Sequence, residues 1–187
     1  DILLYEHSHN KTKENALIHR CLGEAWYRKG NMGKAILHER KAVQLNPADA
    51  AAHENLGLSL AEQGKITEAI DSFKEALRLK PNRFMAHDRL GKLFVLQGRN
   101  EEAMIHFQRA LKIAPKFLNA YIHLGDTLAS QGKLGEAADI YSRAIAVNPE
   151  SAYAHYNLGT ILASQGKIDE AIIHFREAAR IKPNYAK

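Results

Sequence analysis

The sequence predicts an all-α protein built from stacked helical repeats, because its helix-breaking residues recur at one fixed interval. All 5 prolines and all 12 glycines fall on a period of 34 residues. A period of about 20 to 50 residues is typical of arrays in which each unit buries its apolar face against its neighbours. Apolar residues between the breakers recur at helical spacing, which favours helices over strands. The prolines are Pro47, Pro81, Pro115, Pro149 and Pro183.

Each repeat is predicted to hold two helices joined by a short turn, as residues 50–83 illustrate. Gly64 separates the two apolar stretches, and glycine can end a helix in the left-handed conformation without a Cβ penalty. Pro81 closes the repeat, because proline cannot continue a helix. Gly57 lies in the middle of the first helix, where glycine costs about 1 kcal/mol relative to alanine. We therefore expect a neighbouring helix to be pressed against the Gly57 backbone.

Within this frame the residue types resemble the tetratricopeptide repeat (TPR) family. The family pattern runs from a bulky residue through Leu-Gly, an aromatic residue or Leu, a small Ala, an aromatic residue and a second Ala to Pro. The resemblance implies a right-handed α-α superhelix, a solenoid of helix-turn-helix repeats that acts as a protein-interaction scaffold. In the third repeat the pattern is met by His87, Leu90, Gly91, Phe94, Ala103, Phe107, Ala110 and Pro115.

The frame divides the chain into five TPR repeats, which are expected to form one continuous solenoid domain. Residues 1–15 are predicted to be the second helix of a preceding half repeat followed by a linker, and residues 186–187 a short tail. Glu39 departs from the pattern, because the equivalent position is aromatic in the other four repeats. Looser packing is therefore predicted for the first repeat. The repeats are 16–49, 50–83, 84–117, 118–151 and 152–185.

Composition and charge narrow the classes of function. No apolar stretch approaches the roughly 18 residues of a membrane span, and a single Cys excludes an internal disulfide. The net charge of +5 raises nucleic acid as a partner. On the TPR frame, however, the groove-lining positions hold more anions than cations, so no nucleic-acid partner is expected. The cations are Arg20, Arg28, Arg89 and Lys92, and the anions are Glu24, Glu54, Glu62, Asp88 and Asp126.

No arrangement typical of catalysis or metal binding is visible. The 10 histidines mostly occupy equivalent positions of different repeats, and none forms the i, i+4 pair common in metal sites. No Ser/His/Asp or Cys/His arrangement and no phosphate-binding Gly-rich loop is present. We therefore predict that this segment is not an enzyme and has no cofactor and no metal site, although a longer chain could carry a separate catalytic domain.

The TPR resemblance implies that the first helices of the repeats line a concave groove that binds a peptide or a partner helix. Asn55 and Asn157 occupy the sixth position of their repeats. In the similar arrays of O-linked N-acetylglucosamine transferases, Asn at this position forms a ladder that holds a peptide backbone. Only two of the five rungs match, so side-chain pockets must supply most of the affinity. The predicted site residues are Asn55, Arg89, Lys92, Ile122, His123, Asp126, Tyr153, Tyr156 and Asn157.

Two other classes of function stay open. The last repeat ends without a polar capping helix, which leaves the apolar face around Ile172 and Phe175 available for a homo-oligomer. Residues 4–7 and 15–19 resemble the entry to TPR tails of bacterial membrane glycosyltransferase-like proteins. That resemblance implies a substrate-recruiting or regulatory tail outside the cytoplasm, whereas a cytoplasmic location is the default without it.

Overall fold

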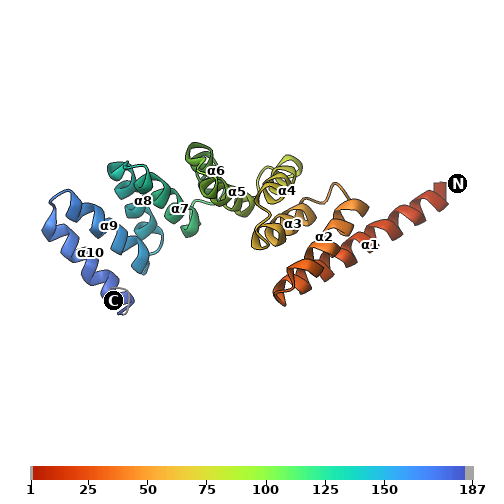
Figure 1. Ribbon diagram of the computed structural model, residues 1–187, viewed down its shortest axis with the longest axis horizontal. Coiled ribbons are helices and arrows are strands. Elements are labelled where there is room, and N and C mark those ends of the chain that lie inside the picture. Colours follow the sequence, from red (N-terminus) through yellow and green to blue (C-terminus); the bar gives the residue numbers. More distant parts are fainter. Residues whose placement is uncertain (1, 184–187) are drawn as a thin grey trace. The chain divides into compact units, whose positions relative to one another are not determined.

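The computed structural model describes residues 2–183, and within this range it contains ten α-helices and no strand (Figure 1). The predicted all-α class is confirmed. The helices α3, α5, α7 and α9 begin at the residues where the sequence frame begins a repeat. The ten helices are α1 (Ile2–Arg28), α2 (Met32–Leu45), α3 (Ala50–Glu62), α4 (Ile66–Leu79), α5 (Phe84–Leu96), α6 (Asn100–Ile113), α7 (Leu118–Ser130), α8 (Leu134–Val147), α9 (Ala152–Ser164) and α10 (Ile168–Ile181).

The chain divides into two compact units, an N-terminal unit of residues 1–93 and a C-terminal unit of residues 94–187. In the N-terminal unit, α1 packs on α2, α2 on α3 and α3 on α4, and α1 also reaches α3. In the C-terminal unit, the helices from α6 to α10 pack in the same sequential manner. The sequence predicted one continuous domain. Helices of a repeat array contact only their neighbours, so such a chain can divide into parts.

One uninterrupted helix, α1, occupies the region where a half repeat and a linker were predicted. It runs for 27 residues, from Ile2 to Arg28. The prediction of a linker within residues 1–15 is therefore wrong. The frame position that holds proline in the five repeats falls here on Lys13, and without the proline ring and its missing N–H nothing stops the helix. The predicted tail at 186–187 lies outside the described residues.

Glycines in the left-handed conformation join the two helices of each repeat. After α3, the Gly64 N–H donates to Ala61 O at 2.9 Å and the Lys65 N–H donates to Leu60 O at 2.9 Å. These bonds satisfy carbonyls at the end of the helix. The predicted left-handed turn is confirmed, with φ between +73° and +78° at Gly30, Gly64, Gly98, Gly132 and Gly166.

A second set of glycines marks the places where a side chain of the second helix presses on the first helix. A Cβ atom on Gly125 would lie 2.8 Å from the Tyr141 ring, and one on Gly57 would lie 3.0 Å from the Phe73 ring. Both rings are fully buried. The close contact predicted at Gly57 is present, and it is made by an aromatic side chain of the adjacent helix.

Candidate functional site

The first repeat buries a carboxyl where the other repeats have an aromatic ring. Glu39, on α2, is only 1% exposed, and a Cβ on Gly23 would lie 2.5 Å from its Cγ. Burial raises the pKa of Glu39, and the nearby Ser59 hydroxyl opposes part of this shift. Neither Glu39 Oε2 nor Ser59 Oγ has a hydrogen-bond partner of good geometry. This is unusual, because nearly all buried polar atoms in proteins are hydrogen-bonded.

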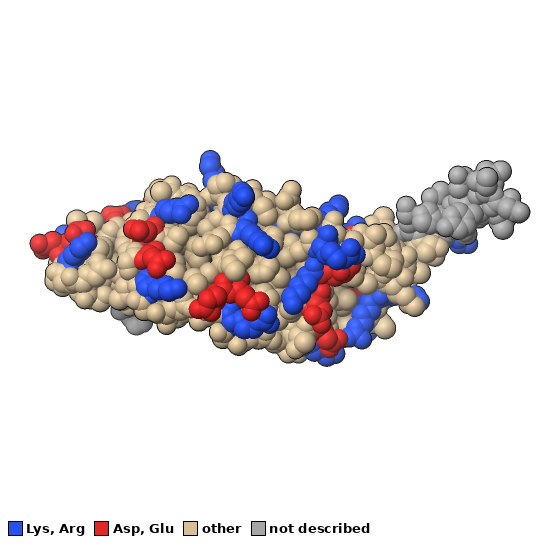
Figure 2. Space-filling model, turned by 90° about the horizontal axis from the view of Figure 1, so that it is seen from above, with Lys and Arg blue, Asp and Glu red and all other residues tan. Residues whose placement is uncertain are grey.

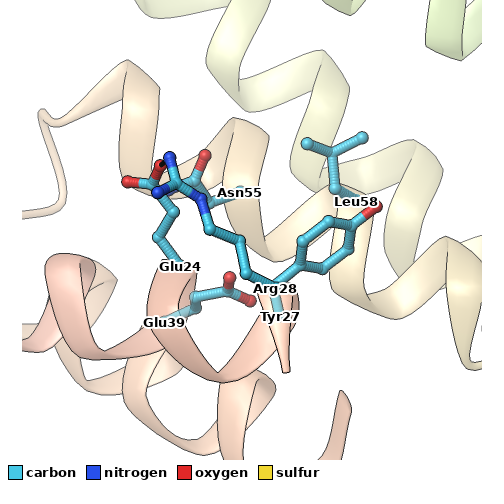
Figure 3. A pocket seen from close by; sticks show the side chains of 6 residues that line it. All are labelled: Glu24, Tyr27, Arg28, Glu39, Asn55 and Leu58. Carbon is cyan, nitrogen blue, oxygen red and sulfur yellow. Dashed lines mark hydrogen bonds and ion pairs between the residues drawn. The ribbon is translucent and has the colours of Figure 1, made fainter. Parts of the chain in front are cut away.

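A cavity of about 200 Å³ lies beside Glu39, between α1, α2 and α3 (Figure 3). Looser packing of the first repeat stays a prediction, because the Glu39 side chain lies as close to Gly23 as the rings lie to the equivalent glycines. In Figure 3 the Glu39 side chain extends beneath the Arg28 side chain, with the Tyr27 ring and Leu58 to one side. Arg28 Nη2 is paired with Glu24 Oε1 at 2.5 Å. The cavity is lined by Glu24, Tyr27, Arg28, Glu39, Asn55 and Leu58.

The structure separates the predicted groove residues of the N-terminal unit into exposed and buried sets. Arg89 and Lys92 are exposed on α5, and Asn55 lines the cavity. Glu54 and Asp88, counted above among the groove anions, are buried, with 6% and 4% of their surface exposed. Glu54 forms an ion pair with Arg83 and so joins neighbouring parts of the array. The sequence count therefore overstated the negative charge available to a ligand.

In the C-terminal unit, Asp126 is engaged by two phenols. Tyr141 donates to Asp126 Oδ1 at 2.5 Å, and Tyr153 donates to Oδ2 at 2.9 Å. Burial and the hydrogen bond to Asp126 raise the pKa of Tyr141. The Asp126 carboxylate therefore positions Tyr153, which remains 39% exposed on α9.

Tyr156 is also 39% exposed on α9, and its ring packs against Phe175 of α10 with centroids 5.7 Å apart. Asn157 Nδ2 donates to Tyr153 O at 3.1 Å, so one of its amide hydrogens is used within its own helix. The two tyrosines and Asn157 thus form a partly exposed polar and aromatic surface on one helix.

Ile122 and His123, the other predicted residues of the C-terminal unit, lie half-buried on α7. The His123 ring packs against Phe107 of α6, with centroids 5.5 Å apart. His123 therefore contributes to the packing between repeats as well as to the surface.

Two histidine pairs bring ring nitrogens together in a way that spacing along the sequence did not predict. His19 and His38 approach to 3.0 Å between their Nδ1 atoms, and so do His155 and His174. His155 Nε2 donates to Pro149 O, so its Nδ1 accepts a hydrogen from His174. The repeat pattern does relate the two pairs, because His19 and His155 occupy one position of their repeats and His38 and His174 occupy another. Across the residues that the structure describes, no group of three or more potential metal ligands converges.

Charged side chains of both signs are interspersed on the face shown in Figure 2, where Lys and Arg lie next to Asp and Glu. Ion pairs also join exposed side chains of the C-terminal unit. Arg99 pairs with Glu102 at 2.7 Å, and Arg180 pairs with Glu150 at 2.8 Å. The positive net charge does not gather into one basic patch on this face.

A profile of the tetratricopeptide repeat matches residues 6–50, 40–84, 54–116 and 123–186. The chain belongs to the tetratricopeptide repeat family. A crystal structure of MamA is 25% identical, with a TM-score of 0.82 over 88% of this chain and 96% of that one. YrrB, described as a TPR protein with an unusual peptide-binding site, is 24% identical, with a TM-score of 0.78 over 97% of this chain and 94% of that one.

PilF of Pseudomonas aeruginosa is 18% identical, with a TM-score of 0.80 over 92% of this chain and 78% of that one. No curated protein matches the chain in sequence. The helices within residues 2–183 include none with the length and apolar character needed to cross a membrane. The repeat family and the shared solenoid fold give this TPR chain the architecture of a protein-interaction scaffold.

Proposed function

We propose that this TPR chain binds an extended peptide or a partner helix along the first helices of its repeats. The observation that carries the proposal is the pair of exposed tyrosines on α9, Tyr153 and Tyr156. Asp126 holds the first by a hydrogen bond, and Phe175 packs against the second. A ligand that packs on side chains already held in place has less conformational entropy to remove. Tyrosine is also enriched at protein interfaces.

Polar contacts from the first helices supplement this aromatic surface. An Asn amide can donate and accept at once, which suits the peptide unit of a ligand. Each net hydrogen bond contributes only about 1 kcal/mol, whereas micromolar affinity requires about 8 kcal/mol. Asn157 therefore sets the register of a ligand on α9, where the apolar contacts to the tyrosines supply most of the affinity. Asn55 offers the same amide group on α3 of the N-terminal unit.

A peptide array probed with the labelled chain tests the proposal. The double substitution Tyr153→Ala/Tyr156→Ala is expected to weaken capture at least tenfold, because it removes most of the aromatic contact. Ile105→Ala is the matched control, since Ile105 is a 49% exposed apolar residue on a second helix, α6. Equal capture by the wild type and both variants would contradict the role of the first helices. Far-UV circular dichroism establishes that each variant keeps its helices.

Self-association is a second candidate, favoured by exposed apolar side chains on α10. Ile168 and Ile172 are 54% and 41% exposed, and they lie one helical turn apart on the same face. Exposed apolar patches tend to mark interaction sites. Light scattering across a range of concentrations should then show a dimer or larger assembly that Ile172→Asp disrupts. A monomer at every concentration would eliminate this candidate.

A further inference from the structure

The cavity in the N-terminal unit combines three features of a site for a cation. Its wall carries a carboxyl that is 1% exposed, one oxygen of that carboxyl has no hydrogen bond of good geometry, and an open space lies beside the residue. We propose that this cavity receives the side chain of a Lys or Arg residue of the bound peptide, with the ligand cation paired to Glu39. The inference rests on the proposed function, since the basic residue belongs to the peptide ligand.

The charges around the cavity favour a cation over an anion. Three of its lining residues are charged, namely Glu24, Arg28 and Glu39. Arg28 is the single cation among them, and it is already joined to Glu24 at 2.5 Å. Glu39 is left without an ion-pair partner in the described part of the chain. A buried carboxylate is strongly destabilising unless a cation or hydrogen-bond donors face it. A ligand cation paired with Glu39 therefore stabilises the charged form of this carboxyl.

The size and walls of the cavity suit one long side chain. Its volume of about 200 Å³ corresponds to roughly seven water molecules at about 30 Å³ each, which is too small for a helix. Tyr27 and Leu58 give it an apolar side on which the methylene groups of Lys or Arg can lie. The Tyr27 ring can also face a cation favourably. Asn55 offers an amide oxygen that accepts a further hydrogen bond.

A purely structural role for Glu39 does not account for these features. In the repeats with an aromatic residue at this position, the ring fills the space against the glycine of the first helix, as Tyr141 does against Gly125. A polar residue retained only for packing would be hydrogen-bonded within the fold. The Ser59 hydroxyl lies near Glu39 but makes no hydrogen bond of good geometry to Oε2. This atom and the adjacent space point instead to a group that arrives from outside.

Substitution of Arg28 provides a second test, with an expected effect on binding opposite to that of substituting Glu39. Its side chain is 76% exposed, so replacing it leaves the buried packing of α1 unchanged. Its guanidinium competes with a ligand cation for the acidic side chains of the cavity. Removing Arg28 should therefore strengthen binding of a basic ligand, whereas removing the Glu39 charge should weaken it.

NMR titration of the whole chain with N-acetyl-arginine amide and N-acetyl-lysine amide tests the site, with N-acetyl-norleucine amide as the neutral probe. The cationic probes should cause saturable shifts at the amides of Tyr27, Asn55 and Leu58, with a dissociation constant on the order of 1 mM. Glu39→Gln should weaken this binding at least tenfold, and Arg28→Ala should strengthen it severalfold. Asp71→Asn, which removes an exposed carboxylate from the second helix α4, should leave it unchanged.

Equal shifts with the norleucine probe, or unchanged binding to Glu39→Gln, would overturn the proposal. A loss with Asp71→Asn as large as that with Glu39→Gln would also overturn it, because it would reveal attraction to general negative charge. Each probe is a single residue with its two flanking amide groups, so the result does not depend on capture of a longer peptide in the array. Failure of the array alone would contradict the proposed function and leave the cation site standing.

Discussion

Glu39 illustrates how a single residue can keep the backbone of a repeat and change its interior. Its side chain meets Gly23 as an aromatic ring meets the equivalent glycine elsewhere, so α1 and α2 still pack together. The carboxyl borders a cavity, and it brings a polar oxygen with no hydrogen bond of good geometry. A residue that lowers stability in this way is typical of a functional position, where stability and activity oppose each other.

Glu39→Phe is expected to raise the thermal midpoint by several degrees at pH 7. The substitution restores an aromatic ring and removes an unpaired buried carboxyl, whose cost is about 1–3 kcal/mol. In a chain of this size each kcal/mol shifts the midpoint by about 2–4 °C. Thermal denaturation followed by circular dichroism measures the change. The same substitution should abolish binding of the cationic probes. A gain in stability together with a loss of binding would show that Glu39 serves binding at the expense of stability.

The stability gained with Glu39→Phe should depend on pH. Burial raises the folded-state pKa of Glu39 above 4.5, so the folded chain holds this proton more tightly than the unfolded chain. That contribution to wild-type stability is complete below pH 4.5 and is lost as pH rises through the folded pKa. The difference between Glu39→Phe and the wild type should therefore be smaller at pH 4 than at pH 7. A difference that stays constant would show that Glu39 is not desolvated.

Gly125→Ala tests the contact between a glycine and a ring. A Cβ there would lie 2.8 Å from the buried Tyr141 ring, and overpacking of this kind costs about 1–3 kcal/mol. Gly135→Ala is the matched control on α8, because nothing lies within 4 Å of the added Cβ. We expect a lower midpoint for Gly125→Ala and an unchanged or slightly higher midpoint for Gly135→Ala. Equal effects would mean that helix propensity outweighs the steric contact.

Two ion pairs occupy equivalent positions in successive repeats, but the positions of the cation and the anion are exchanged. Arg20 of α1 pairs with Asp49 at 3.2 Å, and one repeat later Glu54 of α3 pairs with Arg83. Each pair joins a first helix to the residue that precedes the next one. The exchange of charges disfavours pairing that is shifted by one repeat, because such a shift would place Arg20 opposite Arg83 and Glu54 opposite Asp49.

The His155–His174 pair links α9 to α10 in a manner that depends on pH. Burial, followed by the nearby charge of His155, lowers the pKa of His174, and Glu170 opposes part of this effect. As pH falls below 6.5, the unfolded chain takes up a proton before the folded chain does, so stability falls. His174→Ile, which introduces the residue type of Ile140 at the equivalent position, should reduce this loss. Thermal midpoints at pH 7, 6 and 5 measure it, and parallel curves for wild type and variant would contradict the effect.

The helical frame could be predicted from the sequence because it depends on local chemistry. Gly64 and its equivalents must adopt positive φ, and proline stops a helix wherever it falls. The interior contacts could not be predicted in the same way, since they join residues on different helices. The frame placed Glu39 at the position that is aromatic in the other repeats, but burial of its carboxyl against Gly23 is contrary to the usual exposure of Glu. The two phenols on Asp126 come from different helices, so spacing gave no indication of them.

Across the whole chain, helices pack in sequence order within each unit. The helix packing in the N-terminal unit involves α1 to α4, and that in the C-terminal unit involves α6 to α10. In an array of this kind, stability is close to a sum of the stabilities of single repeats and of the interfaces between neighbours. A substitution should therefore act mainly on its own repeat and the adjacent ones.

Hydrogen exchange of two variants tests this locality. Glu39→Phe should slow exchange in α1 to α3 and leave α7 to α10 unchanged, because local opening reports the stability of the nearby contacts. Gly125→Ala should speed exchange in α7 and α8 and leave α1 to α3 unchanged. Because the two variants are expected to affect different helices, each serves as the control for general effects of substitution on the exchange rate. A uniform change in every helix for either variant would mean that the chain opens as one cooperative body. Stabilising the cavity region would then also rigidify the surface that carries Tyr153 and Tyr156.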